Sequence, residues 1–449
     1  MRTLNLILFI LFSISLSAQK YRKYADELIT KYRELAADTC RCQSTEEWNR
    51  RKEFLYSKVD SAKNYIDAMY ALRYFTPMIN DLHFICPDNY YYNRRDFYKK
   101  TDTIFPALVK TTDKLTVKKD FYGKLPEGAV LLEINGYKAE DIAKTYKYSV
   151  SMEYTDYTGE TDFHSWMAFA NFLFMEKIKA PFHIQYSFNN TIHNVTITGM
   201  ERKILDKQEA NFRKSQKKEP KEKIMEYYQY NQNIGVLRIS TFNGNFNKNL
   251  SAVFEKIKQN QAALVIDLRG NSGGEATNAV RLMGYLTDSI ICYDGVYKYS
   301  EKSRKNLLWR YSITNNDLAD SLKNQFKELS YGDFFESNPI GMCTGKEKYK
   351  YNNPLYILID ESTNSASILF CGYFIKMNRG KIAGLQPRGY MRVGGGYTTR
   401  IDFEIGLETP YSYYPSLECK PLIPNYIIEE KGNEGLDKLV EIINKEMNW

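Results

Sequence analysis

Histidine is scarce in this sequence, and its scarcity narrows the chemistry open to the chain. Only four of the 449 residues are histidines, at positions 83, 164, 183 and 193. A catalytic imidazole, the general base whose ordinary pKa lies nearest neutrality, has to be one of these four.

Cysteine is also infrequent, and its seven positions give no metal-binding pattern. Cys40 and Cys42 form Cys-Arg-Cys rather than Cys-x-x-Cys, and no histidines cluster beside them, so we expect no metal site. Because the number is odd, at least one thiol is free or paired between chains. Cys371 lies in the apolar run "ILFCGYFI" and is interpreted as a small core residue.

Long apolar runs are absent except at the start of the chain. The first eighteen residues, "MRTLNLILFILFSISLSA", join one arginine, an apolar run and small residues, which is typical of a secretory signal cleaved near Ala18. The run is short for a membrane-spanning helix, and no cysteine follows the cleavage point to carry a lipid. We therefore expect an exported protein, periplasmic or extracellular, with no stable membrane anchor.

Positively charged residues exceed negatively charged ones only slightly, and the formal net charge is +8. The most basic stretch, "ERKILDKQEANFRKSQKKEPKEK", lacks any nucleic-acid recognition motif. We interpret residues 204–226 as a solvated basic linker and expect no nucleic-acid partner.

The length of 449 residues allows several domains. Residues 19–100 carry apolar residues at helical spacing, with Ser44 and Glu47 in a capping-box pattern, and predict a helical domain. Residues 101–203 contain short strands, an Asn135-Gly136 turn before a helix, and a hairpin around "NN".

Residues 227–449 alternate between strands and helices and predict an α/β domain with parallel crossovers. The segments "AALVIDLRG" and "PLYILID" are continuous apolar strands, as expected for strands buried on both faces. The Tyr- and Lys-rich stretch 287–350 is predicted to be an irregular insertion.

Two predicted strand-to-helix turns contain the candidate catalytic residues. In "DLRGNSGG", Gly273 and Gly274 permit close backbone approach to a ligand, and in "DESTNSAS" a serine starts a helix. Ser and Asn also cap helices, which is the simpler reading of the second turn alone. Two such turns at one sheet edge can place backbone N–H groups beside a serine, the arrangement that acyl transfer needs.

In their order along the chain, these motifs resemble those of the tail-specific, or C-terminal-processing, serine peptidases and their tricorn-core relatives. The resemblance is strongest over residues 234–285 and 354–390. It implies a crotonase-like (ClpP/crotonase) α/β catalytic domain over 227–449, a PDZ-like domain over 101–203, and hydrolysis of a peptide or protein substrate without a metal or organic cofactor.

The resemblance implies a role for each residue of the second turn and its neighbours. The serine that begins Ser-Ala-Ser, Ser365, matches the family's nucleophile, and the amides of Gly273 or Gly274 and of Ala366 would form the oxyanion hole. Ser367 lies about 200° further around the helix and faces elsewhere.

The base of the processing-protease branch is a lysine, but the position in register here is Tyr390, and Lys381 is out of register. The tricorn-like branch uses a histidine and a glutamate. On that pattern "NDLHF" gives His83 as the base and "ECKPLIPNY" gives Glu418 as the carboxylate that orients it.

Departures from the family pattern leave an alternative open. Leu82 replaces a small residue, and the residues after Glu418 differ from the family's motif. We expect a serine peptidase, and the alternative is a catalytically inactive peptide-binding or scaffold protein on the same fold. An acyl-CoA enzyme on this fold conflicts with the signal sequence, because acyl-CoA is cytosolic. The sequence leaves the cleavage preference and the oligomeric state unknown.

Overall fold

The computed structural model describes most of the chain after residue 20. The described residues are 21–37, 44–72, 74–75, 78, 101–111, 114–147, 168–216, 223–244, 246–257, 261–290, 295–301, 303–305, 307–308, 316–336, 344, 347, 349–387, 391, 396–400, 406–410, 412–413, 417 and 420–449. The predicted signal segment 1–18 and every cysteine except Cys371 lie outside them. No helix within these ranges is long and apolar enough to cross a membrane.

Helices form the N-terminal part of the described chain, as predicted. They are a helix over residues 21–35, α2 (Thr45–Asp60) and α3 (Tyr65–Leu72). The Ser44 hydroxyl caps α2 by accepting a hydrogen bond from the Glu47 amide at 3.1 Å, which confirms that half of the predicted capping box. These helices enclose their own apolar cluster, which includes Tyr32, Leu55 and Phe75.

An antiparallel sheet follows. Its strands, in spatial order with β5 paired to β4, are β2 (Ala107–Thr111), β3 (Leu115–Asp120), β4 (Val130–Ile134), β5 (Tyr137–Lys138), β6 (Phe182–Phe188) and β7 (Thr191–Ile197). The predicted "NN" hairpin is confirmed, because Asn189 and Asn190 have φ values of 51° and 61° and join β6 to β7. Asn135 and Gly136 form the tight turn from β4 to β5.

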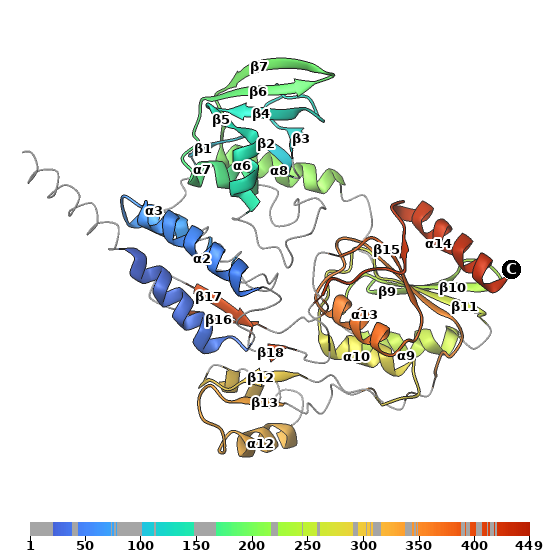
Figure 1. The fold of residues 1–449 in the computed structure, drawn as a ribbon. Helices are drawn as coiled ribbons and strands as arrows, with labels where there is room; N and C mark the ends of the chain where they lie inside the picture. Colours follow the sequence, from blue (N-terminus) through green and yellow to red (C-terminus); the bar gives the residue numbers. More distant parts are fainter. Residues whose placement is uncertain are drawn as a thin grey trace, which may run out of the picture.

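Helices and a short strand pair complete this part of the chain (Figure 1). They are α6 (Ala139–Lys147), α7 (Ala168–Met175), α8 (Arg202–Gln216) and the pair β1 (Thr103–Ile104) with β8 (Met200–Glu201). The basic stretch 204–226 is thus helical through Gln216 rather than an open linker. The physical reason is Leu205, which is 1% exposed and packs into the apolar cluster of the antiparallel sheet. The domain boundaries stay predictions.

A mixed six-stranded sheet forms the α/β part. In spatial order its strands are β19 (Tyr426–Ile427), β15 (Lys381–Gly384), β14 (Leu355–Ile359), β11 (Ala263–Asp267), β10 (Ile234–Ile239) and β9 (Met225–Gln229). Neighbours from β10 to β19 are parallel, as predicted, and only β9 at the edge is antiparallel. Every residue of β11 and β14 is buried, in line with their continuous apolar sequence.

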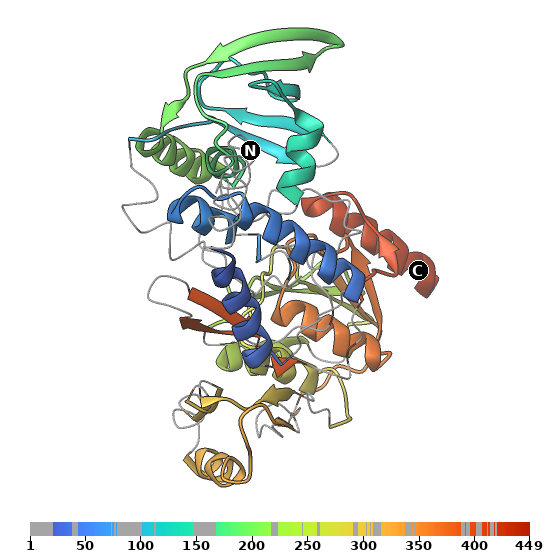
Figure 2. The ribbon, with the colours of Figure 1, turned by 60° about the vertical axis from the view of Figure 1, so that its left-hand side comes forward.

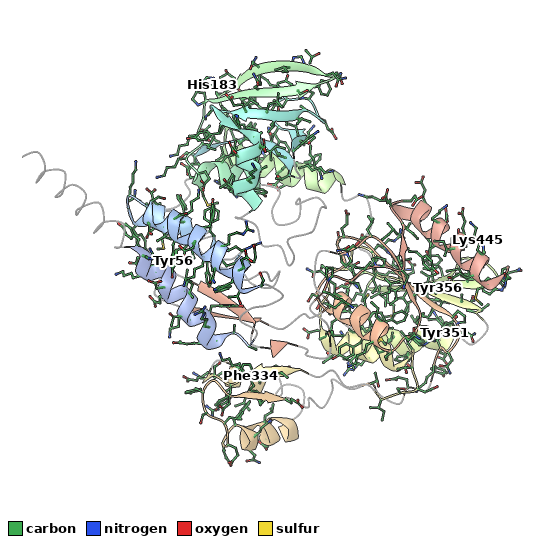
Figure 3. The ribbon with its side chains drawn as sticks, viewed as in Figure 1. Tyr56, His183, Phe334, Tyr351, Tyr356 and Lys445 are labelled. Atoms are coloured by element: carbon green, nitrogen blue, oxygen red, sulfur yellow. The ribbon has the colours of Figure 1, made fainter. Side chains whose placement is uncertain are left out.

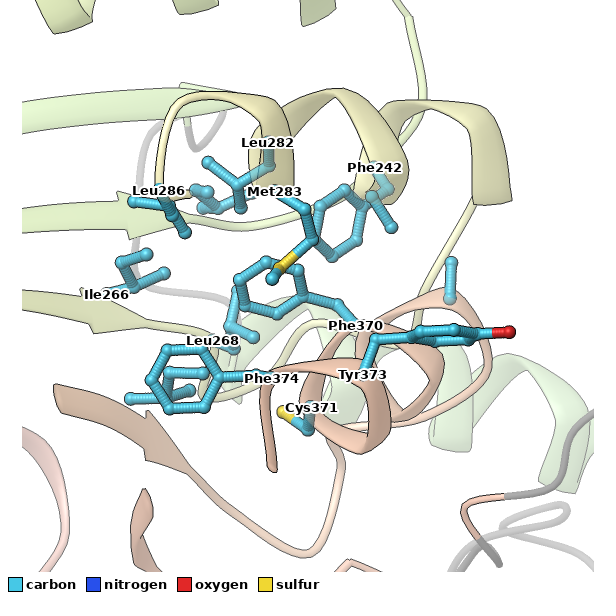
Figure 4. Packing of buried hydrophobic residues seen from close by; sticks show 14 of the residues in the cluster. Phe242, Ile266, Leu268, Leu282, Met283, Leu286, Phe370, Cys371, Tyr373 and Phe374 are labelled. Carbon is cyan, nitrogen blue, oxygen red and sulfur yellow. The ribbon is translucent and has the colours of Figure 1, made fainter. Parts of the chain in front are cut away.

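Helices cover both faces of this sheet. On one face lie α9 (Phe246–Ile257), α10 (Ala276–Gly284) and α13 (Ala366–Lys376), and on the other lies α14 (Gly432–Met447) (Figure 1). Phe370 of α13 meets Phe242 with ring centroids 6.1 Å apart, and Met283 of α10 packs beside them (Figure 4). This packing fixes the start of α13 against the segment that follows β10.

The predicted irregular insertion is partly wrong, because it contains regular structure. Its elements are β12 (Val296–Lys298), α12 (Asn316–Gln325) and β13 (Phe334–Glu336), and β12 also pairs with β18 (Ser412–Tyr413). Tyrosine rings supply apolar surface for a small core that the sequence did not predict. For example, Tyr297 stacks on Phe335 with ring centroids 5.6 Å apart.

Two chain-distant segments lie beside the N-terminal helices. One is the hairpin of β16 (Gly396–Arg400) and β17 (Gly406–Pro410), seen in both views (Figures 1 and 2). The other is the insertion, whose Lys298 ammonium donates to the Arg33 carbonyl at 2.7 Å. Two segments from the C-terminal half of the chain therefore lie beside the N-terminal helices.

Candidate active site

The two strand-to-helix turns singled out from the sequence meet at one edge of the mixed sheet. β11 and β14 are parallel, and Asp267 pairs with Leu358, so their carboxyl ends lie side by side. The Asn364 amide donates to the Asn271 carbonyl at 3.1 Å, and the Thr363 hydroxyl donates to the Leu268 carbonyl at 3.1 Å. These two hydrogen bonds join one turn to the other.

Asp360 adds a third connection and shapes the second turn. Its carboxylate accepts from the Gly270 amide of the first turn at 3.0 Å, and from the Ser362 and Thr363 amides at 3.0 and 3.1 Å. One carboxylate thus accepts hydrogen bonds from three backbone N–H groups, one in the first turn and two in its own turn. The loop that leads into α13 is therefore rigid on the side facing Gly270.

Ser365 occupies a strained backbone conformation at the start of α13. Its φ and ψ are 52° and −121°, a region that residues with a side chain rarely adopt, and its hydroxyl does not cap the helix. The residue's own N–H donates instead to the Asn364 side-chain oxygen at 2.7 Å. The simple reading of this serine as a helix cap is therefore wrong, and the strain points to a functional position.

Gly273 lies directly against Ser365. A Cβ atom built on Gly273 would come within 2.6 Å of the Ser365 Cβ and 2.9 Å of the Ala366 nitrogen. The φ of Gly273 is +106°, which glycine adopts without penalty. Only glycine fits here, and it brings backbone amides beside the serine.

The predicted oxyanion donors differ in their hydrogen bonds. The Gly273 amide already donates to the Asn271 side-chain oxygen at 2.9 Å. Among the described residues, the amides of Gly274 and Ala366 have no hydrogen-bond acceptor, and Gly274 is exposed. The Ala366 amide also belongs to the first turn of α13, where the helix dipole favours negative charge.

A family comparison agrees with this geometry. Residues 233–419, which contain both turns, match the family model described as Peptidase family S41. Over residues 233–419 the chain is therefore similar to the peptidases of family S41. Members of this family are serine peptidases, and hence hydrolases, of the tail-specific or C-terminal-processing kind, so the resemblance seen in the sequence is confirmed. No curated protein matches the sequence.

Solved structures share the overall fold of this chain. The crystal structure of mature CPAF superposes with a TM-score of 0.57 at 13% identity, over 96% of this chain and 97% of that one. A serine-to-alanine mutant of CPAF gives 0.62 at 12% identity, over 96% and 97% of the two chains. Mature CPAF complexed with lactacystin gives 0.56 at 13% identity, over 96% and 99%. The shared architecture extends over nearly the full length of these chains.

The other two serines of this segment, Ser362 and Ser367, differ from Ser365 in their surroundings. Ser362 is in the turn, where its amide is bonded to Asp360. Ser367 is fully buried, and its hydroxyl has no hydrogen-bond partner among the described residues. The neighbouring Cys371 is also fully buried, and burial raises the pKa of its thiol well above the ordinary value. Cys371 is thus the inert core residue that the sequence predicts.

The candidate base and its carboxylate, His83 and Glu418, lie outside the described residues, as do Tyr390 and His164. The two described histidines are exposed on the antiparallel sheet. His183 faces Thr196 at 3.1 Å and His193 stacks on Tyr186, while Figure 3 shows His183 on a different part of the chain from the mixed sheet.

Lys381 lies at the wrong end of its strand to act on Ser365. It begins β15 and pairs in register with Tyr356, near the start of β14, whereas the two turns follow the strands' carboxyl ends. Its ammonium donates to the Tyr426 hydroxyl at 2.8 Å and to the Glu446 carboxylate. The prediction that Lys381 is not the base agrees with this position.

Several residues that support the turns were not identified from the sequence. Asp267 is 2% exposed and is bonded to Arg238 at 3.1 Å and Arg269 at 2.8 Å. These two ion pairs border a polar cavity of about 530 Å³ on the α14 side of the turns. Within the part of the chain that the structure describes, no group of three His, Cys, Asp or Glu residues could hold a metal.

Asn271 is another residue of the first turn that was not identified from the sequence. It is completely buried, and its side-chain amide donates to the Ile239 carbonyl at 3.0 Å while its side-chain oxygen accepts from Gly273. The one available signal was an asparagine inside the motif "DLRGNSGG", between two residues with positive φ, Gly270 and Gly273.

Proposed function

We propose that this chain is an exported serine peptidase that cleaves peptide bonds through an acyl-enzyme intermediate. Ser365 is the nucleophile, His83 the general base and Glu418 the carboxylate that orients the imidazole. The Ser365 Oγ attacks the scissile carbonyl, His83 takes the hydroxyl proton and passes it to the leaving amine, and water then hydrolyses the ester.

The observation that carries the proposal is the strained Ser365 pressed against Gly273. Its φ is 52°, and a Cβ on Gly273 would lie 2.6 Å from the Ser365 Cβ. A protein keeps such strain where the surrounding hydrogen bonds over-determine it, and strained residues gather at active sites. Here the Asn364 amide, which donates to the Asn271 carbonyl, and the Asp360 carboxylate, which accepts from the Gly270 amide, supply that constraint.

Charge stabilisation supports the same chemistry. A tetrahedral intermediate carries an oxyanion, and the predicted donors are the amides of Gly273 or Gly274 and of Ala366. Because Gly273 donates to Asn271, we favour Gly274 and Ala366. The buried aromatic packing beneath α13 holds the Ala366 amide without further reorganisation.

His83 and Glu418 rest on the sequence pattern and on the chemistry of the triad. Neutral imidazole accepts a proton near pH 7, and a carboxylate beside it fixes the tautomer. The strand β18 ends five residues before Glu418 and pairs with β12 of the insertion. That pairing anchors the chain just before the proposed carboxylate.

The proposed substrate is a peptide or protein segment in extended conformation. The antiparallel sheet β2-β3-β4-β6-β7 has two edge strands, and we propose that it is a PDZ-like domain beside a crotonase-like catalytic domain. Its sheet edge could take an added peptide strand. Hydrolysis by a triad needs no metal or organic cofactor, and the N-terminal segment directs the enzyme to the periplasm or the extracellular space.

The test compares turnover of an unfolded protein by three forms of the mature chain. Ser365→Ala is expected to lower the rate by about 10⁴-fold or more. Ser367→Ala, two residues along the same helix, is the matched control and is expected to keep full activity. It removes a buried hydroxyl without a partner, so the melting temperature should stay equal or rise.

Two outcomes would contradict the proposal. Equal turnover by wild type and Ser365→Ala would assign the hydrolysis to another residue. Absence of turnover by well-folded wild-type protein that still binds peptides would support the inactive peptide-binding alternative.

A further inference from the structure

We propose that Thr241 positions the peptide unit between Gly273 and Gly274 so that the Gly274 amide is the oxyanion donor. Thr241 lies in the segment that follows β10 and belongs to neither of the two motifs identified from the sequence. The inference rests on the proposed function and names a residue that acts through the backbone rather than on the substrate.

Two donors hold the Gly273 carbonyl oxygen. The Phe242 amide donates to it at 2.9 Å, and the Thr241 hydroxyl donates to it at 3.1 Å. The Thr241 hydroxyl also accepts from the Asn243 amide at 3.2 Å, which fixes its orientation. Phe242 is completely buried against α13, so this segment is a rigid support.

The orientation of the carbonyl decides the orientation of the next amide. A trans peptide is planar, so the Gly274 N–H points opposite to the Gly273 C=O. Since the C=O is aimed at Thr241 and Phe242, the Gly274 N–H is directed away from them. Gly274 is exposed, so its amide can meet a ligand, and the preceding Gly273 lies against the Ser365 side chain.

The Gly273 amide makes a separate hydrogen bond within the first turn. It donates at 2.9 Å to Asn271, whose own side chain is bonded to the end of β10. Both peptide units that flank the Gly273 Cα are therefore fixed, one by Asn271 and the other by Thr241 and Phe242. This double constraint holds Gly273 at its φ of +106°.

A second donor matters because glycine is flexible. Gly273 and Gly274, with φ values of +106° and +140°, have no side chain to restrict rotation of the peptide unit between them. With the Phe242 amide alone, the carbonyl keeps one hydrogen bond and the plane can rotate about it. The Thr241 hydroxyl supplies the second point that stops this rotation.

The experiment compares Thr241→Val with Thr241→Ser in the full mature chain. Valine keeps the shape of threonine and removes the hydroxyl, whereas serine keeps the hydroxyl and removes the methyl group. Thr241→Val is expected to lower kcat and the labelling rate with a fluorophosphonate probe by about 10- to 100-fold, with KM within about twofold. Thr241→Ser is expected to restore both rates to near the wild-type values.

Other outcomes overturn the inference. Wild-type rates for Thr241→Val, or equal loss in Thr241→Ser, would show that the hydroxyl does not position the donor. If Thr241→Val does not fold, the structure of the wild-type phosphonate adduct decides. A phosphonate oxygen within hydrogen-bond distance of the Gly274 nitrogen supports the inference, and one bonded to the Gly273 nitrogen overturns it. Ser365→Ala that labels like wild type would instead refute the proposed function.

Discussion

At the residue scale, the site depends on close contact between a glycine and a serine that are 92 positions apart in the chain. Gly273 has no room for a methyl group, because that group would meet both the Ser365 side chain and the Ala366 nitrogen. Its positive φ adds a second reason for glycine. The two requirements coincide at the position where the proposed oxyanion donors begin.

Gly273→Ala is therefore expected to abolish turnover, because Ser365 or the Gly273–Gly274 peptide must move. The matched control is Gly270→Ala in the same loop. Gly270 also has a positive φ, of +74°, but nothing lies within 4 Å of its Cβ position. The control should lose about 1–2 kcal/mol in the free energy of unfolding and keep most of its kcat. Steady-state kinetics and denaturant unfolding measure both, and equal kcat losses in the two variants would contradict the steric account.

The sequence predicted the key residues of this contact but not its geometry. The glycine pair and the serine stood out because residue types at strand-to-helix turns carry a local signal. Asn271, Asp360 and Thr363 did not, because their hydrogen bonds join turns that are distant in sequence. Asparagine, aspartate and threonine are common in any turn, so composition alone cannot reveal such partners.

At the element scale, α14 is fixed to the mixed sheet by a polar cluster around Glu446. The carboxylate accepts from Lys381 of β15, from Tyr426 of β19, and from the Tyr356 hydroxyl of β14 at 2.7 Å. Partial burial raises the pKa of Glu446, but the hydrogen bonds from these three side chains outweigh it and leave the pKa below the ordinary 4.5. The charged form thus favours the folded state.

Glu446→Gln is expected to lower the free energy of unfolding by about 1 kcal/mol at pH 7, since Lys381 is partly exposed. A carboxyl whose folded pKa is depressed contributes stability above its unfolded pKa, and that contribution is lost as pH falls through the folded value. The difference between the variant and wild type should therefore vanish at strongly acidic pH. Urea unfolding from pH 7 to pH 3 measures it.

The control for this prediction lies on the same helix. Glu441 pairs with Lys438 at 3.0 Å in an exposed position, so Glu441→Gln should change stability little at any pH. A pH-independent loss in Glu446→Gln, or an equal loss in Glu441→Gln, would contradict a specific role for the cluster.

Elements were predictable where their burial pattern is simple. The strands β11 and β14 were expected because continuous apolar runs are typical of strands buried on both faces. The insertion and α8 were misread, because their contacts with the rest of the chain come from tyrosines and from single leucines such as Leu205. A tyrosine is amphipathic, so we interpreted these residues as exposed from the sequence, whereas the structure buries their rings.

At the scale of the whole molecule, the proposed mechanism needs three distant stretches of chain to converge. The nucleophile comes from the α/β part, His83 from the segment after the N-terminal helices, and Glu418 from the segment before β19. The Lys298–Arg33 contact and the β16–β17 hairpin show that the insertion and the C-terminal part reach the helical part (Figure 2). Such long-range convergence leaves no local pattern, so only the family resemblance could suggest it.

His83→Ala is expected to lower kcat by about 10⁴-fold or more and to leave the melting temperature nearly unchanged. Glu418→Gln should be milder, with a loss of about 10²–10⁴-fold, because it only orients the imidazole. Turnover and thermal unfolding of the purified variants check both. Full activity in His83→Ala would transfer the role of base to another group.

The most direct test of the account is the identity of the residue that a fluorophosphonate modifies. Wild-type protein is treated with the probe, digested, and the adduct is located by tandem mass spectrometry. The account predicts a single adduct on Ser365, lost when the protein is unfolded before treatment. An adduct on any other residue, or none on the folded protein, would contradict the claim that the strained serine at the start of α13 is the nucleophile.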